Sequence, residues 1–170
     1  MTGTIDDTAL RGLIDRQAIQ DVLLRYCRGI DRRDFDLVRS CYHDDAYDLH
    51  GSYEGGPDGF IEHVSRNLPE WDATMHFIGN QLIELDGDIA RCESYCVSHH
   101  RKEATGTEPA LDMVIGLRYV DRMERRAGAW RIAHHVCAME WSRVDPVTGI
   151  WEFAPGTVRG RPFPDDIIYR

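Results

Sequence analysis

The sequence contains no run of about eighteen apolar residues, the length that a membrane-spanning helix requires. Basic residues are few, since 20 Lys and Arg stand against 29 Asp and Glu and give a formal net charge of −9. Nucleic-acid binding depends on clustered Lys and Arg, so this balance argues against a nucleic-acid partner. Residues 1–17 are polar and acidic and lack the apolar segment of a signal peptide. We therefore expect a cytoplasmic protein that binds neither nucleic acid nor a membrane.

Cysteine and histidine patterns of metal sites are missing as well. The five cysteines are an odd number in a chain of 170 residues, and only Cys92 and Cys96 lie close together in sequence. No second pair completes a zinc site around them, and neither His-x-His nor His-Glu-x-x-His spacing occurs. We therefore expect reduced thiols without a disulfide framework, no catalytic metal and no cofactor.

The N-terminal third of the chain has the periodicity of helices. A long amphipathic helix is expected over residues 8–32, because its apolar residues recur at helical spacing and form one stripe. That stripe contains Ile19, Val22, Leu23, Tyr26 and Ile30. Asp34 is expected to cap a short helix over 35–41, and Pro57 suits the first turn of a third helix over 57–68.

The rest of the domain reads as strands. We expect a short strand within 46–54 and four long ones over 74–85, 89–101, 111–124 and 129–142. Asp86-Gly87-Asp88 between the first two long strands is a strong hairpin signal. Helices followed by long antiparallel strands indicate an α+β domain over 1–143, with an irregular tail over 144–170 that covers a pocket or a subunit interface.

Asp31 is a candidate for catalysis because of its place on the first helix. It ends the apolar stripe, four residues after Cys27 and eight after Leu23, so it lies at the edge of the buried face. A half-buried carboxylate loses solvation and becomes a better base, whereas a carboxylate at a helix end can equally form a salt bridge with Arg32. Spacing alone leaves both interpretations open.

His76 and Tyr26 are candidates with equally ordinary alternatives. A single strand histidine such as His76 is more often a hydrogen-bonded core residue than a catalyst, and a tyrosine on an apolar stripe is ordinarily a core residue. A carboxylate partner would fix the tautomer of His76 and raise its pKa, so that it can remove a proton and return it elsewhere. Tyr26 would then polarise a substrate carbonyl or assist a leaving hydroxide.

Two adjacent histidine pairs, His99–His100 and His134–His135, lie on predicted strands. Neighbouring residues of a strand face opposite ways, so only one member of each pair can point into the interior. This arrangement further weakens a metal interpretation.

Several segments resemble SnoaL-like proteins of the nuclear transport factor 2-like superfamily. Residues 15–34 (DRQAIQDVLLRYCRGIDRRD) are similar to the opening of that family, and the resemblance continues through 53–55 (YEG), 76–80 (HFIGN) and 128–132 (GAWRI). It covers about residues 10–142. The resemblance implies a cone-shaped α+β barrel in which a strongly curved mixed or antiparallel sheet wraps three N-terminal helices.

Three eliminating lyases of that superfamily resemble the chain most: scytalone dehydratase, bile-acid 7-alpha-dehydratase and hexachlorocyclohexane dehydrochlorinase. The resemblance implies that Asp31 and His76 match their shared aspartate and histidine and that Tyr26 matches a tyrosine of the bile-acid enzyme. We assign substrate binding, in part on the same match, to a second group of residues: His50, His99, His135 and Tyr119. The arginine that the latter two enzymes carry on a strand has no clear counterpart.

These assignments predict a cofactor-independent lyase. His76, oriented by Asp31, would remove a proton next to a carbonyl of a hydrophobic cyclic or aromatic small molecule, and water would leave. The expected apolar lining comprises Leu23, Met75, Phe77, Met113 and Ile115. Two alternatives stay open: an isomerase or polyketide-type cyclase that forms the same enolate, and a non-catalytic binding module or dioxygenase small subunit. We expect a homo-oligomer through the outer sheet face, a trimer rather than a dimer.

Overall fold

The first helix, α1 (Asp7–Arg32), positions half of the candidate site. It begins because the Asp6 carboxylate accepts a hydrogen bond from the Thr8 backbone N–H at 3.0 Å. It ends where Arg33 adopts a left-handed conformation, with φ of 56°, and donates its N–H to carbonyls of the last turn. The predicted apolar stripe is buried. Asp31 is thereby held on the last turn of the helix.

The computed structural model describes residues 6–149 and 152–170 of the chain. Within these ranges the helices are α1, α2 (Phe35–Ser40), α3 (Pro57–Asn67) and the short 3₁₀ turns η1 (Leu68–Glu70) and η2 (Ile167–Tyr169). The strands are β1 (Tyr42–His50), β2 (Tyr53–Gly55), β3 (Ala73–Asp86), β4 (Ile89–Lys102), β5 (Leu111–Arg126) and β6 (Ala129–Pro146). The predicted α+β order is confirmed.

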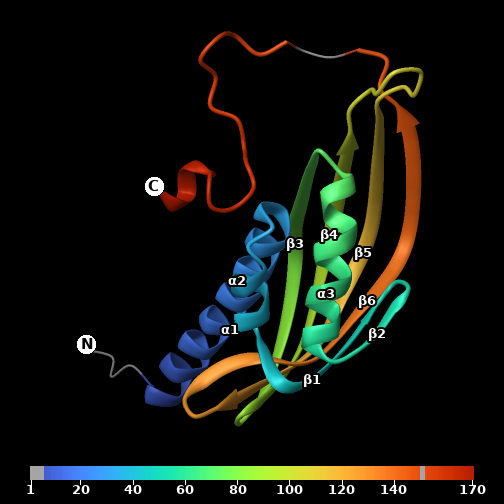
Figure 1. Ribbon diagram of the computed structural model, residues 1–170. Helices are drawn as coiled ribbons and strands as arrows, with labels where there is room; N and C mark the ends of the chain where they lie inside the picture. The colour runs from blue at the N-terminus through green and yellow to red at the C-terminus, as the bar shows by residue number, and fades with distance from the viewer. Residues whose placement is uncertain (1–5, 150–151) are drawn as a thin grey trace.

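The strands form one mixed sheet in the order β2-β1-β6-β5-β4-β3. All neighbours are antiparallel except β1 and β6, which run parallel and bring the early strand beside the last one. The sheet is curved and not closed, and the three α-helices pack on its concave side (Figure 1). The expected cone-shaped α+β architecture is therefore present, with an interior between helices and sheet.

The core lies where α1 crosses this concave face. Its side chains are buried almost completely and come from both the stripe of α1 and the inward positions of the strands: Ile19, Leu23, Tyr26, Phe60, Tyr119, Met123 and Ile132. Burial of each large apolar side chain contributes about 1.5–3 kcal/mol. The core therefore fixes α1 against the sheet and with it the position of Asp31.

The region before α3 differs from its prediction. The short strand expected within 46–54 is a hairpin, in which β1 starts earlier and turns at Gly51, with φ of 61°, into β2. The start of β1 was missed because Asp44 and Asp45 give it the composition of a loop. Both carboxylates are exposed and pair with arginines of other elements, Arg39 and Arg126. The strand is thus extended by its pairing with β6 despite its polar sequence.

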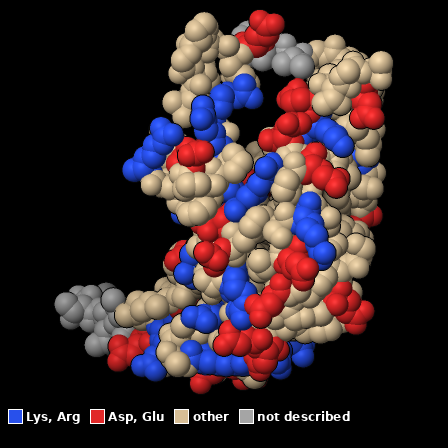
Figure 2. All heavy atoms as spheres, viewed as in Figure 1, with Lys and Arg blue, Asp and Glu red and all other residues tan. Residues whose placement is uncertain are grey.

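Charged side chains of both signs are interspersed over the viewed face of the molecule (Figure 2). Many form pairs between elements; Arg125, for example, contacts both Asp15 of α1 and Asp88 of the β3–β4 turn at 2.6–2.7 Å. Surface pairs of this kind contribute about 0–1 kcal/mol each and mainly fix orientation. None of the described helices has the length and the apolar character that crossing a membrane demands.

The C-terminal segment crosses back to the end of α1 (Figure 1). Phe163 donates its backbone N–H to the Arg32 carbonyl at 2.6 Å, and the Asp166 carboxylate lies 3.5 Å from the Arg32 guanidinium. Arg159 to Pro162 line a cavity of about 130 Å³ together with Asp31 and Thr74. The tail therefore borders the helix end that carries the candidate acid.

Candidate active site

Asp31 and His76 lie in direct contact. Oδ1 of Asp31 is 2.7 Å from Nδ1 of His76, and Oδ2 accepts the His76 backbone N–H at 2.9 Å. Both side chains are largely buried, with exposed fractions of 12% and 7%. The carboxylate therefore holds the ring and its backbone at once. Such contact favours the tautomer protonated at Nδ1, which leaves the Nε2 lone pair free to accept a proton.

Electrostatics keep the Asp31 carboxyl ionised. Burial acts to raise its pKa, but the side-chain hydrogen bond and charge of His76 outweigh that effect, and the pKa lies below its ordinary value of 3.8. An ionised Asp31 stabilises the imidazolium that His76 would become after taking up a proton. The pair thus has the arrangement of an oriented general base.

His100, rather than His99, lies next to this pair. The ring centroids of His76 and His100 are 5.7 Å apart, and burial, followed by the charge of His76, lowers the pKa of His100 to about 4. His100 is therefore neutral near pH 7. His99 faces the other side of the sheet, where its Nε2 lies 3.4 Å from Asp112. The structure does not bring His99 together with the other candidates.

A β-bulge is the reason for this difference. Asp86 pairs with Ile89 at the β3–β4 turn. If the pairing continued from there without a bulge, His76 would lie opposite His99. Two residues of β3, Gly79 and Asn80, instead oppose the single residue Tyr95, and His76 pairs with Ser98. The extra residue reverses which side chains of β3 and β4 share a face. His100 therefore points inward with His76.

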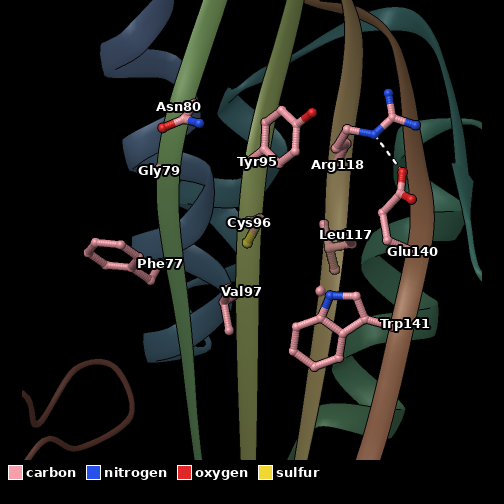
Figure 3. A pocket seen from close by; sticks show the side chains of 11 residues that line it. Phe77, Gly79, Asn80, Tyr95, Cys96, Val97, Leu117, Arg118, Glu140 and Trp141 are labelled. Atoms are coloured by element: carbon pink, nitrogen blue, oxygen red, sulfur yellow. Dashed lines mark hydrogen bonds and ion pairs between the residues drawn. The ribbon is translucent and has the colours of Figure 1, made fainter.

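The bulge also divides the expected apolar lining. Met113 and Ile115 pair with His100 and Ser98, so they share the inner face with His76 and line a cavity of about 250 Å³ with Ser142. Met75 and Phe77 are exposed on the outer face, and their assignment to the lining is wrong. Figure 3 shows Phe77 on that face. The inner face available to a ligand is therefore built from β5 and β6 more than from β3.

The remaining candidates form a second group around His135. Its ring centroid lies 5.3 Å from that of Tyr26 and 4.8 Å from that of Tyr119, and 5.8 Å from that of His50. Nδ1 of His135 is 2.5 Å from Oδ1 of Asp121, and both side chains are fully buried. The predicted residues Tyr26, Tyr119, His50 and His135 are thus brought together, but around a second Asp–His pair.

His50 lies within electrostatic reach of both groups. Burial lowers its pKa well below the ordinary 6.5, and positive charge on His135 or His76 acts in the same direction. His50 is therefore neutral and presents a free ring nitrogen to the interior. Tyr26 and Tyr119 are fully buried, and burial raises the pKa of each hydroxyl well above 10. Both phenols remain protonated hydrogen-bond donors.

Sequence reasoning missed three residues of the interior: Asp48, His100 and Asp121. The spacing Asp48-Leu49-His50 contained a signal, because two polar residues two apart on a strand share one face. Asp121 had none, since a single aspartate on a long strand is ordinarily exposed. Its place follows from the pairing of Asp121 with His135 across β5 and β6.

A family model of the SnoaL-like domain matches residues 11–136. Among curated relatives, an uncharacterised protein of Mycobacterium tuberculosis strain H37Rv is 29% identical over 126 residues, which span 72% of this chain and 83% of the relative. The terrestric acid biosynthesis cluster protein E of Penicillium crustosum is 28% identical over 138 residues, which span 78% of this chain and 88% of that protein.

Solved structures share the fold. The hexachlorocyclohexane dehydrochlorinase LinA-type3 of Novosphingobium barchaimii superposes with a TM-score of 0.71 at 24% identity, over 86% of this chain and 99% of that chain. A scytalone dehydratase-like protein of Novosphingobium aromaticivorans gives 0.69 at 16% identity, over 83% and 97%. Likeness at these identities concerns the fold, and a fold does not fix a reaction. Because the family model covers most of its length, this chain belongs to the SnoaL-like domain family.

Proposed function

We propose that the protein is a lyase that eliminates water from a hydrophobic cyclic or aromatic small molecule, with His76 as the general base. The observation that carries this proposal is the buried contact between Asp31 and Nδ1 of His76 at 2.7 Å. A base oriented in this way accelerates proton removal by roughly 10²–10⁴-fold. The proposed base chemistry itself needs no cofactor.

The substrate would enter with its acidic carbon toward His76. Nε2 of His76 takes the proton from a carbon next to a carbonyl, and the electron pair moves onto the carbonyl oxygen as an enolate. The enolate then reforms the carbonyl and expels the hydroxyl group of the next carbon, which takes back the proton held on Nε2 of His76 and leaves as water, so that the neutral base is regenerated. The proposed donor to the developing anion is the phenol of Tyr26, whose buried hydroxyl has no hydrogen-bond partner among the described residues, and a donor of this kind is worth about 10²–10³-fold.

The chemistry of the interior supports a hydrophobic substrate. Met113 and Ile115 line the inner face beside His100, and the neutral His100 adds a hydrogen-bonding group without a charge. The name of a solved relative, a hexachlorocyclohexane dehydrochlorinase, describes elimination from an apolar ring by a protein of this fold. The alternative is an isomerase or cyclase, because it shares the enolate-forming step.

The test uses a panel of hydrophobic cyclic β-hydroxy ketones and mass spectrometry of the products. The wild-type protein should release a product that is lighter by one water. His76→Ala should lose about 10²–10⁴-fold in rate, and Asp31→Asn should lose at least about 10²-fold because the ring loses its ionised partner.

The matched control is His99→Ala, which removes a histidine from the outer face of the adjacent strand and should retain wild-type turnover. A product of unchanged mass would replace the lyase by the isomerase. Equal rates in His76→Ala and wild type would remove the pair from the mechanism.

A further inference from the structure

The second group of interior residues contains three unpartnered ligand atoms that converge. Asp48, His50 and His135 each offer one atom, and these three atoms lie within 4.8 Å of one another. In the described part of the chain, Oδ1 of Asp48, Nδ1 of His50 and Nε2 of His135 are buried without a hydrogen-bond partner. An unsatisfied buried polar atom costs about 1–3 kcal/mol. Three such unsatisfied atoms close together indicate that one common partner would bind all three.

The other polar atoms of these side chains are already held. Nδ1 of His135 contacts Oδ1 of Asp121 at 2.5 Å, and the Tyr42 hydroxyl donates to Oδ2 of Asp48 at 2.5 Å. These contacts orient the two side chains and leave one free atom on each, directed toward the other and toward His50. A carboxylate behind a histidine ring is the usual support of a metal-bound imidazole.

Strand pairing explains how the three residues meet. Asp48 and His50 are two apart on β1 and therefore share its inner face. β6 runs parallel to β1, and its register places His135 opposite Asp48. The motif is thus Asp-x-His on one strand and His on its parallel neighbour, which no spacing rule along the sequence reveals.

We propose that Asp48, His50 and His135 bind a divalent transition-metal ion. Two imidazole nitrogens and one carboxylate oxygen suit zinc or ferrous iron and disfavour Mg²⁺ and Ca²⁺, which prefer oxygen ligands. The ion would also offset the buried Asp48 and Asp121 carboxylates, whose side chains are fully buried. Three protein ligands leave a position for water or for a substrate oxygen.

Binding requires a small contraction of the site. Bonds of about 2.0–2.2 Å to a tetrahedral ion place ligand atoms roughly 3.4 Å apart, closer than the 3.9 Å between Nδ1 of His50 and Oδ1 of Asp48. The His50 side chain is 24% exposed and lies at the end of β1, so it has room to move inward. Asp48 and His135 are fixed by their own partners.

The test uses the full chain without a polyhistidine tag, freed of metal by a chelator and titrated with Co²⁺. We expect one Co²⁺ per chain, with visible absorption typical of a protein-bound ion, and displacement of that absorption by Zn²⁺. His50→Gln should abolish it, and Asp121→Asn should weaken Co²⁺ binding by about 10–100-fold, the range for loss of such a supporting carboxylate.

The matched control is His134→Gln, which removes the neighbouring histidine whose side chain alternates to the other face of β6. It should bind Co²⁺ like the wild type. His76→Ala should do the same, and this result would show that Co²⁺ binding does not depend on the proposed base. Wild-type protein without cobalt absorption, or equal binding by His50→Gln, overturns the proposal. His50→Gln is preferred to a His135 variant because its partly exposed side chain should tolerate exchange; unfolding curves of the metal-free proteins verify this.

Discussion

At the scale of single residues, the position of Asp31 was predictable and that of its neighbours only in part. The apolar stripe of α1 placed Asp31 at the edge of the buried face, and family resemblance pointed to His76. The structure brings the two into contact. His99, which was assigned through the same resemblance, faces the outer side of the sheet, and His100 points inward with His76, because the bulge at Gly79 reverses the faces of the strand pair. A bulge depends on local backbone geometry that the residue pattern does not encode.

His100 should make the stability of the fold depend on pH. Its pKa is 6.5 ordinarily and about 4 in the folded state, because burial and the charges of His76 and His99 outweigh the attraction of Asp31. Between these values the unfolded chain binds a proton that the folded chain refuses, so stability is lost as pH falls from 6.5 toward 4. One such group contributes a slope of at most about 1.4 kcal/mol per pH unit.

The measurement is the free energy of unfolding by urea at several pH values for wild type and His100→Gln. The variant should show a shallower decline between pH 6.5 and 4, while some slope remains because burial also lowers the pKa of His50. Parallel curves for both proteins would show that His100 is not held neutral by the fold.

At the scale of elements, close packing between α1 and α2 can be tested at Gly29. A Cβ there would lie 2.6 Å from Cγ2 of Val38 and 3.0 Å from its backbone nitrogen. Alanine gains about 1 kcal/mol of helix propensity over glycine, but overpacking costs about 1–3 kcal/mol. Since the backbone of α2 must move, we expect Gly29→Ala to destabilise the protein by about 1 kcal/mol, measured by urea unfolding.

Gly12 of the same helix provides the matched control. Its Cβ would meet only Cδ1 of Leu85, at 3.9 Å, which is an ordinary contact. Gly12→Ala should therefore stabilise the protein by up to about 1 kcal/mol. If both substitutions stabilise the protein, α1 and α2 pack less closely at Gly29 than the distances in the structure indicate.

The bounds of helices and strands were predictable from the sequence where one local signal determined them. The long strands and their hairpin turn were predicted to within a few residues, because alternation and Asp86-Gly87 act locally. The start of β1 was not predicted, because its aspartates are paired with Arg39 and Arg126, which belong to other elements. The proximity of Asp48 and His135 could not be predicted from the sequence either, because it arises from the parallel pairing of β1 with β6, which are far apart in the chain.

At the scale of the whole molecule, the outer sheet face carries exposed apolar side chains. Phe77, Tyr95, Val97 and Trp141 lie there around a cavity of about 620 Å³ (Figure 3). Arg118, at its edge, is paired with two glutamates at 2.5 and 2.6 Å, so its charge is already neutralised. Exposed apolar patches of this kind mark protein interfaces. We keep the prediction that a second copy of this chain covers the face in a homo-oligomer, a trimer rather than a dimer.

Light scattering during size-exclusion chromatography tests this prediction. The wild type should elute as an oligomer, and Val97→Glu should shift it toward the monomer because a charge would be buried in the interface. The control, Leu13→Glu, exchanges an apolar residue on α1 that is more exposed than Val97 (66% against 41%) and should leave the mass unchanged. A monomeric wild type at micromolar concentration contradicts the prediction.

The proposed function requires that His76 remove a proton from a carbon acid held in the interior. The most direct measurement is deuterium uptake from heavy water at the carbon next to the carbonyl of bicyclic aromatic ketones, followed by NMR. Wild type and His99→Ala should accelerate uptake equally, and uptake with His76→Ala should be about 10²–10⁴-fold slower. Uptake by His76→Ala at the wild-type rate would contradict the account.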